Sequence, residues 1–147
     1  LTWQTSERQE SLLDLQAQLE VLSPTLPPAI ALNVTEAGQW PRPGFDAVFS
    51  ANTCHIMSTA AVPHLLAGAS RVLRPGGLLL LYGPFHDGGV HTAASNAAFD
   101  QHLRSLDPAM GVRDASELVQ QAQNLGLERL ADLPLPANNR MLVLERR

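Results

Sequence analysis

The stretch that decides the fold is Leu73-Arg74-Pro75-Gly76-Gly77-Leu78-Leu79-Leu80-Leu81-Tyr82-Gly83. Pro75 presets φ for the second position of a β-turn, and Gly76 supplies the positive φ that a type II turn needs next. The apolar run that follows shows no apolar/polar alternation, which predicts a central parallel strand covered on both faces. The turn therefore joins a helix to a strand, and this favours a doubly wound α/β fold.

The elements predicted on either side follow the order of an α/β sheet. Ser6 with Gln9 resembles a capping box, Asp114 is a helix N-cap, and Gly126 suits the residue after a helix end. The two last strands are joined by a short connection, so we expect an antiparallel hairpin within a single domain, residues 1–147. Strands are expected at 1–5, 29–34, 45–50, 78–83, 127–133 and 140–146, and helices at 6–22, 60–73, 95–106 and 114–125.

Length and composition exclude several classes of protein. The 147 residues are enough for one domain with its own core, and the net charge of −4 argues against a nucleic-acid partner. Cys54 is the only cysteine, so an intramolecular disulfide is excluded and a reducing compartment is expected. No apolar run reaches the length of a membrane span, and no signal-peptide pattern is present. We therefore expect a cytoplasmic protein with no membrane partner.

Several blocks of sequence resemble the class I S-adenosylmethionine-dependent methyltransferases, and among these the methyltransferase-like 26 proteins. The Leu-Arg-Pro-Gly-Gly turn is only moderately specific, but the set of blocks covers nearly the whole chain. The further blocks are Asp46-Ala-Val-Phe-Ser-Ala-Asn-Thr53, His55-Ile-Met-Ser58, Leu81-Tyr-Gly-Pro-Phe85, Ser95-Asn96, Phe99-Asp100, Asp107-Pro108, Met110-Gly111, Arg113-Asp114 and Pro136-Ala-Asn-Asn139.

The resemblance implies a Rossmann-like sheet, mostly parallel with an antiparallel C-terminal hairpin, that binds S-adenosylmethionine and methylates an unidentified acceptor. It also implies that the first βα unit is missing from these residues, because they contain no Gly-x-Gly and open on Leu1-Thr2-Trp3-Gln4, which reads as a strand. We expect a longer parent protein, weak cofactor binding by these residues alone, and open strand edges that a homodimer would cover.

Four residues are expected to bind the cofactor. Glu7 matches the acid that hydrogen-bonds the ribose hydroxyls, although Ser6 could be the aligned residue and a first-turn acid also suits a helix. Asn33 ends a strand near the expected adenine position, or forms a turn. Asn52 and Thr53 follow the strand that faces the transferred methyl group, because ligands bind at the carboxyl ends of parallel strands.

His55 is the candidate catalytic residue. Its pKa lies near neutrality, so it can act as a general base toward the acceptor. A single histidine at a strand end can equally be a hydrogen-bonded structural residue.

Two groups of residues are expected to bind the substrate. One follows the apolar strand and the other lies between the closing strands; Tyr82 alternatively belongs to the core, and the two asparagines alternatively form a turn. The residues are Tyr82, Phe85, His86, Asn138, Asn139 and Arg140.

Other functions are less well supported. No His/Cys pair has zinc-ligand spacing, and Cys54 is expected to be a small buried apolar residue. One rival to a methyltransferase is a non-catalytic binding or assembly module that keeps the fold but has lost the cofactor site. A second rival, a nicotinamide-dependent oxidoreductase, is disfavoured by the closing hairpin and the Leu-Arg-Pro-Gly-Gly turn.

Overall fold

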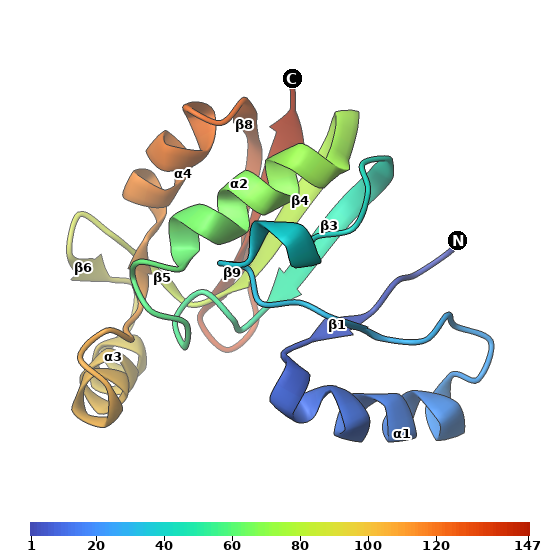
Figure 1. The fold of residues 1–147 in the computed structure, drawn as a ribbon. Coiled ribbons are helices and arrows are strands. Elements are labelled where there is room, and N and C mark those ends of the chain that lie inside the picture. The colour runs from blue at the N-terminus through green and yellow to red at the C-terminus, as the bar shows by residue number, and fades with distance from the viewer. The chain divides into compact units, whose positions relative to one another are not determined.

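The computed structural model describes residues 1–147, which form two compact units, residues 1–41 and residues 42–147 (Figure 1). The sequence predicts a single domain, and that these two units together form one stays a prediction. None of the helices combines the length and the apolar character that a membrane crossing demands.

The unit formed by residues 1–41 contains two short parallel strands and a helix. Residues Ser6 and Glu7 pair with Ile30 and Ala31, and the amide of Leu32 donates to the Glu7 carbonyl at 2.8 Å. The elements are β1 (Ser6–Glu7), the 3-10 helix η1 (Gln9–Ser11), α1 (Leu12–Leu22), β2 (Ile30–Ala31) and the 3-10 helix η2 (Ala37–Gln39).

Three predictions for this unit are wrong in their boundaries. The first strand lies at Ser6–Glu7 and not at residues 1–5, because Ser6 and Glu7 are the residues that pair with β2. The capping box is therefore absent: Ser6 belongs to the strand, Arg8 precedes η1 without a side-chain cap, and the α-helix starts only at Leu12. The second strand is also shorter than residues 29–34.

The unit formed by residues 42–147 is built on a four-stranded sheet in the order β3-β4-β9-β8. Strands β3 and β4 are parallel, and β9 is antiparallel to both β4 and β8, so three strands point the same way. This confirms the predicted hairpin and the mostly parallel sheet. The strands are β3 (Phe45–Ala51), β4 (Leu73–Gly83), β8 (Leu127–Leu135) and β9 (Asn139–Arg146).

Two helices, α2 (Val62–Val72) and α4 (Ala115–Gln123), pack on this sheet and on each other (Figure 1). The Ser70 hydroxyl donates to the Leu125 carbonyl at 2.6 Å and ties the two helices together. Within β4, Leu79 and Leu81 are fully buried, whereas Leu78, Leu80 and Tyr82 are only partly buried. The prediction that both faces of this strand are covered is therefore confirmed in full for one face and only in part for the other.

The Arg-Pro-Gly-Gly segment loops out between α2 and the paired part of β4. Phe45 pairs with Leu73 but Ala47 already pairs with Leu78, so the ladder is irregular at this point. Gly76 has φ +79°, as a type II turn requires. A Cβ on Gly77 would lie 2.9 Å from the Arg74 carbonyl oxygen, so only glycine fits there.

The segments predicted as loops around residues 84–92 and 107–113 contribute a small second sheet in the order β6-β5-β7. Local sequence did not indicate it, because two of its strands are two residues long and depend on pairing with β5. Its elements, with the helix beside it in Figure 1, are β5 (Phe85–Asp87), β6 (Val90–His91), α3 (Ala94–Leu106) and β7 (Arg113–Asp114).

The local signals at helix and strand ends are confirmed in this unit. The Asp114 carboxylate accepts hydrogen bonds from the amides of Ser116 and Glu117, as an N-cap does. Gly126 has the left-handed backbone that was predicted for it, with φ +74°, but it lies one residue beyond the C′ position because the C-cap of α4 is Asn124. Between β8 and β9, Ala137 and Asn138 have φ +60° and +57°, the left-handed pair of a type I′ turn.

Replacing Ala137 by glycine should raise the free energy of unfolding by about 0.5–1 kcal/mol, because alanine is strained in the left-handed region. Ala131→Gly in β8, where φ is not positive, is the matched control and should lower it by a similar amount. Urea denaturation of both variants measures the two effects, and a loss of stability in Ala137→Gly would contradict the turn geometry.

Candidate functional site

The candidate site lies where β3 and β4 end. The Asn52 amide, directly after β3, donates to the Tyr82 carbonyl at 2.8 Å. A Cβ on Gly83 would lie 3.6 Å from His55 Nδ1 and 3.7 Å from Asn52 Oδ1. Three residues from two strand ends thus converge, at the edge where ligands bind in parallel sheets.

Asn52 holds a left-handed backbone conformation with φ +57°. Asparagine tolerates this region better than other side chains, but the conformation still costs free energy and is common at functional sites. The turn directs the chain away from β3, and the side-chain amide of Asn52 has no hydrogen-bond partner within the protein. It is therefore available to a ligand.

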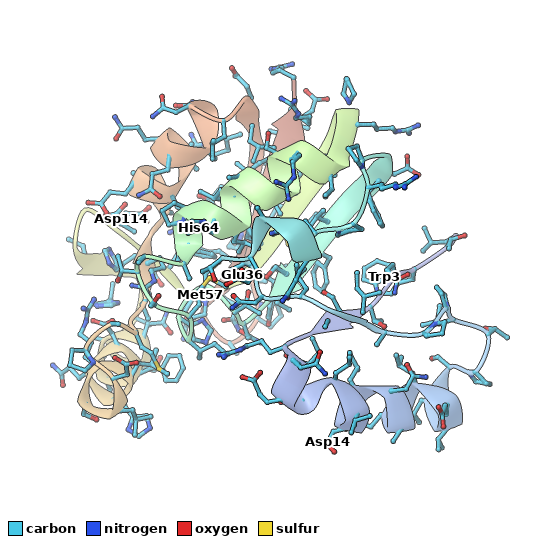
Figure 2. All side chains as sticks on the ribbon, viewed as in Figure 1. Trp3, Asp14, Glu36, Met57, His64 and Asp114 are labelled. Carbon is cyan, nitrogen blue, oxygen red and sulfur yellow. The ribbon has the colours of Figure 1, made fainter.

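A tight loop follows Asn52 and carries His55. The Thr53 carbonyl accepts hydrogen bonds from the amides of Ile56 and Met57, at 3.1 and 3.0 Å, and the Thr53 hydroxyl bonds that of Ser50 (Met57 is labelled in Figure 2). The polar groups of Thr53 thus shape the loop. Its role toward the cofactor stays a prediction.

His55 is only 5% exposed, and its imidazole makes an edge contact with the ring of Phe99 at 5.2 Å between centroids. Its carbonyl accepts from the Gly111 amide at 3.0 Å, but neither ring nitrogen has a hydrogen-bond partner in the chain. Burial, and second the positive charge of Arg113, lower the pKa of His55. The imidazole is therefore neutral at pH 7 and able to accept a proton.

Arg113 of β7 is the main residue that sequence reasoning gave no role. Its Nε donates to the Cys54 carbonyl at 2.9 Å, its Nη1 to Thr59 Oγ1 at 2.8 Å, and its Nη2 to the Met57 carbonyl at 2.6 Å. The only sequence signal was its place in one of the similarity blocks. These three partners lie more than fifty positions earlier in the chain, beyond the reach of any local pattern.

Tyr82 and Asn139, two predicted substrate residues, are in contact: the Asn139 side-chain amide donates to the Tyr82 hydroxyl oxygen at 3.0 Å. The neighbouring hairpin turn is held to α3, because the buried side chain of Asn96 donates to the Asn138 carbonyl at 3.0 Å. The Asn138 side chain also reaches Ser95 Oγ at 3.4 Å. The turn that carries both asparagines is thus fixed beside the end of β4.

Arg140 is fully engaged with carboxylates. Its guanidinium makes two hydrogen bonds to Asp132 of β8 and two to Asp87 of β5, and the hydrogen bonds to Asp132 are the main reason that its pKa is raised. Its side chain is largely buried. The structure thus shows Arg140 joining the main sheet to the small one, and a substrate contact stays a prediction.

Phe85 and His86 lie just beyond the end of β4. Phe85 is 1% exposed and packs in the core, so its position lends no support to a substrate contact. His86 Nδ1 accepts from the Gly89 amide at 3.1 Å and lies 3.4 Å from Oδ2 of Asp114, which is labelled in Figure 2. Its contacts stabilise the β5–β6 hairpin.

Glu7 and Asn33 belong to the unit formed by residues 1–41: Glu7 is the last residue of β1, and Asn33 follows β2. One carboxylate oxygen of Glu7 accepts from the Arg8 amide at 2.7 Å. Asn33 Oδ1 accepts from the amide and the hydroxyl of Thr35, which is the turn-forming alternative. Cofactor contacts by these two residues stay predictions.

No group of three or more His, Cys, Asp or Glu side chains is arranged to hold a metal ion. Cys54 is buried, and burial raises the pKa of its thiol to about 11. It is the small buried side chain that the sequence predicted.

A family model described as "Protein of unknown function (DUF938)" matches residues 1–146. The chain belongs to the DUF938 family. The narrower resemblance to methyltransferase-like 26 proteins stays a prediction.

Solved structures of methyltransferases share the fold of this DUF938 chain. An O-methyltransferase family protein from Burkholderia thailandensis superposes with a TM-score of 0.85 at 16% identity, covering 99% of this chain and 44% of that one. The mitomycin 7-O-methyltransferase MmcR gives 0.83 at 21% identity, covering 100% and 42%. PigF with SAH gives 0.77 at 14%, covering 97% and 47%. The predicted Rossmann-like methyltransferase fold is confirmed, and the chain spans less than half the length of these proteins.

The end of β3 is chemically suited to S-adenosylmethionine. The side-chain amide of Asn52 has no partner in the protein and can both donate to and accept from the polar groups of such a ligand. Because residue 83 is glycine, the space between Asn52 and His55 that a side chain would fill stays open. The carbonyl and the hydroxyl of Thr53, by contrast, already make hydrogen bonds within the protein. Asn52 is thus the residue of this unit whose polar groups would be free to hold such a ligand.

The stability of the protein should fall in mild acid because of His55. Below about pH 6.5 the unfolded chain takes up a proton at this position while the folded chain resists it, so unfolding becomes easier. The slope from this single group is at most about 1.4 kcal/mol per pH unit. Urea denaturation between pH 7 and pH 5 should show a steeper loss in the natural protein than in His55→Gln; equal slopes would contradict the burial of a neutral imidazole.

Cys54 should be unreactive in the folded protein. With a pKa of about 11 and a buried sulfur, only roughly one thiol in a thousand is ionised at pH 8. A chromogenic disulfide reagent at pH 8 should label it slowly in buffer and fully in denaturant. Rapid labelling of the folded protein would show that the loop after β3 is open.

Proposed function

We propose that the protein is an S-adenosylmethionine-dependent methyltransferase that modifies a small acceptor through a nucleophile that carries a proton, such as a hydroxyl. The observation that carries the proposal is the convergence of Asn52, His55 and Gly83 at the carboxyl ends of two parallel strands, within a methyltransferase fold. The fold alone supports the class of protein, and the three residues supply a place and a base for the chemistry.

S-adenosylmethionine, when bound, would supply a methyl group on a sulfonium, whose carbon an acceptor attacks in line as S-adenosylhomocysteine leaves. The protein's part is to position the acceptor, exclude water and remove the acceptor's proton. His55 suits the last task because its ring nitrogens are unpartnered and its lowered pKa leaves them unprotonated at pH 7. The acceptor's proton would pass to an imidazole nitrogen, as the new bond to carbon forms and the bond to sulfur breaks.

Tyr82 is proposed to bind the acceptor. Because its hydroxyl oxygen accepts from Asn139, the hydroxyl proton remains available to donate to a ligand. The hairpin turn fixed by Asn96 sets the direction of this group.

Two measurements on the whole natural protein test the function. Titration calorimetry with S-adenosylmethionine should show binding, and incubation with the cofactor carrying a tritium-labelled methyl group should transfer label to a compound in a fractionated small-molecule extract. Binding without transfer, or no binding at all, would favour the alternative of a non-catalytic module; binding of a nicotinamide cofactor in its place would favour an oxidoreductase.

His55→Gln should lower kcat/KM for the labelled acceptor by about 10²- to 10⁴-fold, as expected for loss of a general base, with the affinity for S-adenosylmethionine nearly unchanged. His64→Gln is the matched control, because His64 is exposed on α2 (Figure 2) and should leave the rate unchanged. In the natural protein kcat/KM should rise with pH through a pKa below 6.5. A His55→Gln protein with full activity would exclude His55 as the base.

A further inference from the structure

Hydrogen bonds join the loop that carries His55 to residues 109–113, and Arg113 makes three of them. Besides its bonds to Cys54, Met57 and Thr59, its Nη2 donates to the Ala109 carbonyl at 3.0 Å. The Thr59 amide donates to the same Ala109 carbonyl, also at 3.0 Å. Residues 54–59 and 109–113 thus form one hydrogen-bonded bracket around His55.

The partners of Arg113 are all neutral. Three carbonyls and one hydroxyl accept its hydrogen bonds, and no carboxylate lies within ion-pair distance. A partly buried arginine usually has a carboxylate partner, because an unpaired charge is costly to bury. Arg113 is therefore not held by an ion pair, and its positive charge is not neutralised by a carboxylate in direct contact.

The other charged groups around His55 do not cancel this charge. On α3, Asp100 is 3.1 Å from Arg104 Nε and accepts from the Val112 amide, and its attraction for Arg113 is outweighed by the repulsion from Arg104. Cys54 is a neutral thiol at pH 7. On the β3 and β4 ends, Asn52 and Gly83 carry no charge. Arg113 is thus the cation that His55 experiences.

We propose that Arg113 is a positioning residue for His55: its planar guanidinium holds the 54–59 loop in place by three hydrogen bonds, and its charge, which has no carboxylate at ion-pair distance, keeps the imidazole in the proton-accepting form. This rests on the proposed function, in which His55 accepts the acceptor's proton. The lowered pKa of His55, caused first by burial and second by Arg113, agrees with it.

Lysine and glutamine each reproduce only half of this arrangement. A lysine ammonium keeps the charge but cannot spread donors over partners on both sides of the bracket, whereas glutamine keeps two donors and loses the charge. The two variants therefore separate the effect of the charge from the effect of the clamp.

The test is an NMR titration of the whole protein with labelled histidine, together with amide hydrogen exchange at Gly111, whose N–H donates to the His55 carbonyl. Arg113→Gln should raise the midpoint of His55 by about half to one pH unit and speed exchange at Gly111. Arg113→Lys should leave the midpoint low but still speed the exchange. Arg129→Gln, an exposed arginine of β8, is the control for net charge.

The proposal is overturned if Arg113→Gln leaves either the His55 midpoint or the Gly111 exchange rate as in Arg129→Gln. If Arg113→Gln does not fold, Thr59→Val removes two bonds of the bracket, the one that the Thr59 hydroxyl accepts from Arg113 and the one that it donates to the Ala109 carbonyl. This variant must then speed exchange at Gly111 without moving the midpoint. Once an acceptor is known, Arg113→Gln should lower kcat/KM by about 10- to 100-fold at pH 7, with the loss shrinking as the pH rises. Both NMR readouts decide the role of Arg113 even if the protein proves to bind no S-adenosylmethionine.

Discussion

The pairing of β4 with β3 on one side and β9 on the other is the interaction on which the rest of the structure depends. It aligns Ala51 with Tyr82, and Tyr82 in turn with Met141, so the ends of three strands meet at one level. Leu79 and Leu81 are fully buried beneath the helices, and a slip of one residue would turn them outward. The same register that buries the core therefore places Asn52, Gly83 and the β8–β9 turn side by side.

Much of the 42–147 unit could be predicted because its signals are local. The Pro75-Gly76 turn, the leucine run after it, the Asp114 cap and Gly126 each depend on a few neighbouring residues. The segments that were mispredicted depend on partners elsewhere in the chain. Strand β1 is two residues long and exists only through its pairing with β2, and β5, β6 and β7 likewise define one another.

The candidate site divides in the same way. Asn52, His55 and Tyr82 could be singled out from the sequence, because each lies at or just after the end of a strand that the sequence pattern predicts. No role was predicted for Arg113 or Asn96, whose hydrogen bonds reach 59 and 42 positions along the chain. Arg140 was assigned to the substrate from its place between the closing strands, and its two carboxylate partners on other strands could not be read from that place. Residue type at a strand end can be read from sequence; the pairing of a charge cannot.

In the function proposed for this protein, the loop after β3 forms the methyl-transfer site and His55 faces the acceptor. The decisive experiment is a structure of the whole natural protein crystallised with S-adenosylhomocysteine. We expect the sulfur of the ligand to lie beside the end of β3, with the Asn52 side chain in contact with the ligand and the His55 imidazole turned toward the space that an acceptor would fill. A ligand bound away from Asn52 and His55, or a protein that takes up no ligand at high concentration, would contradict it.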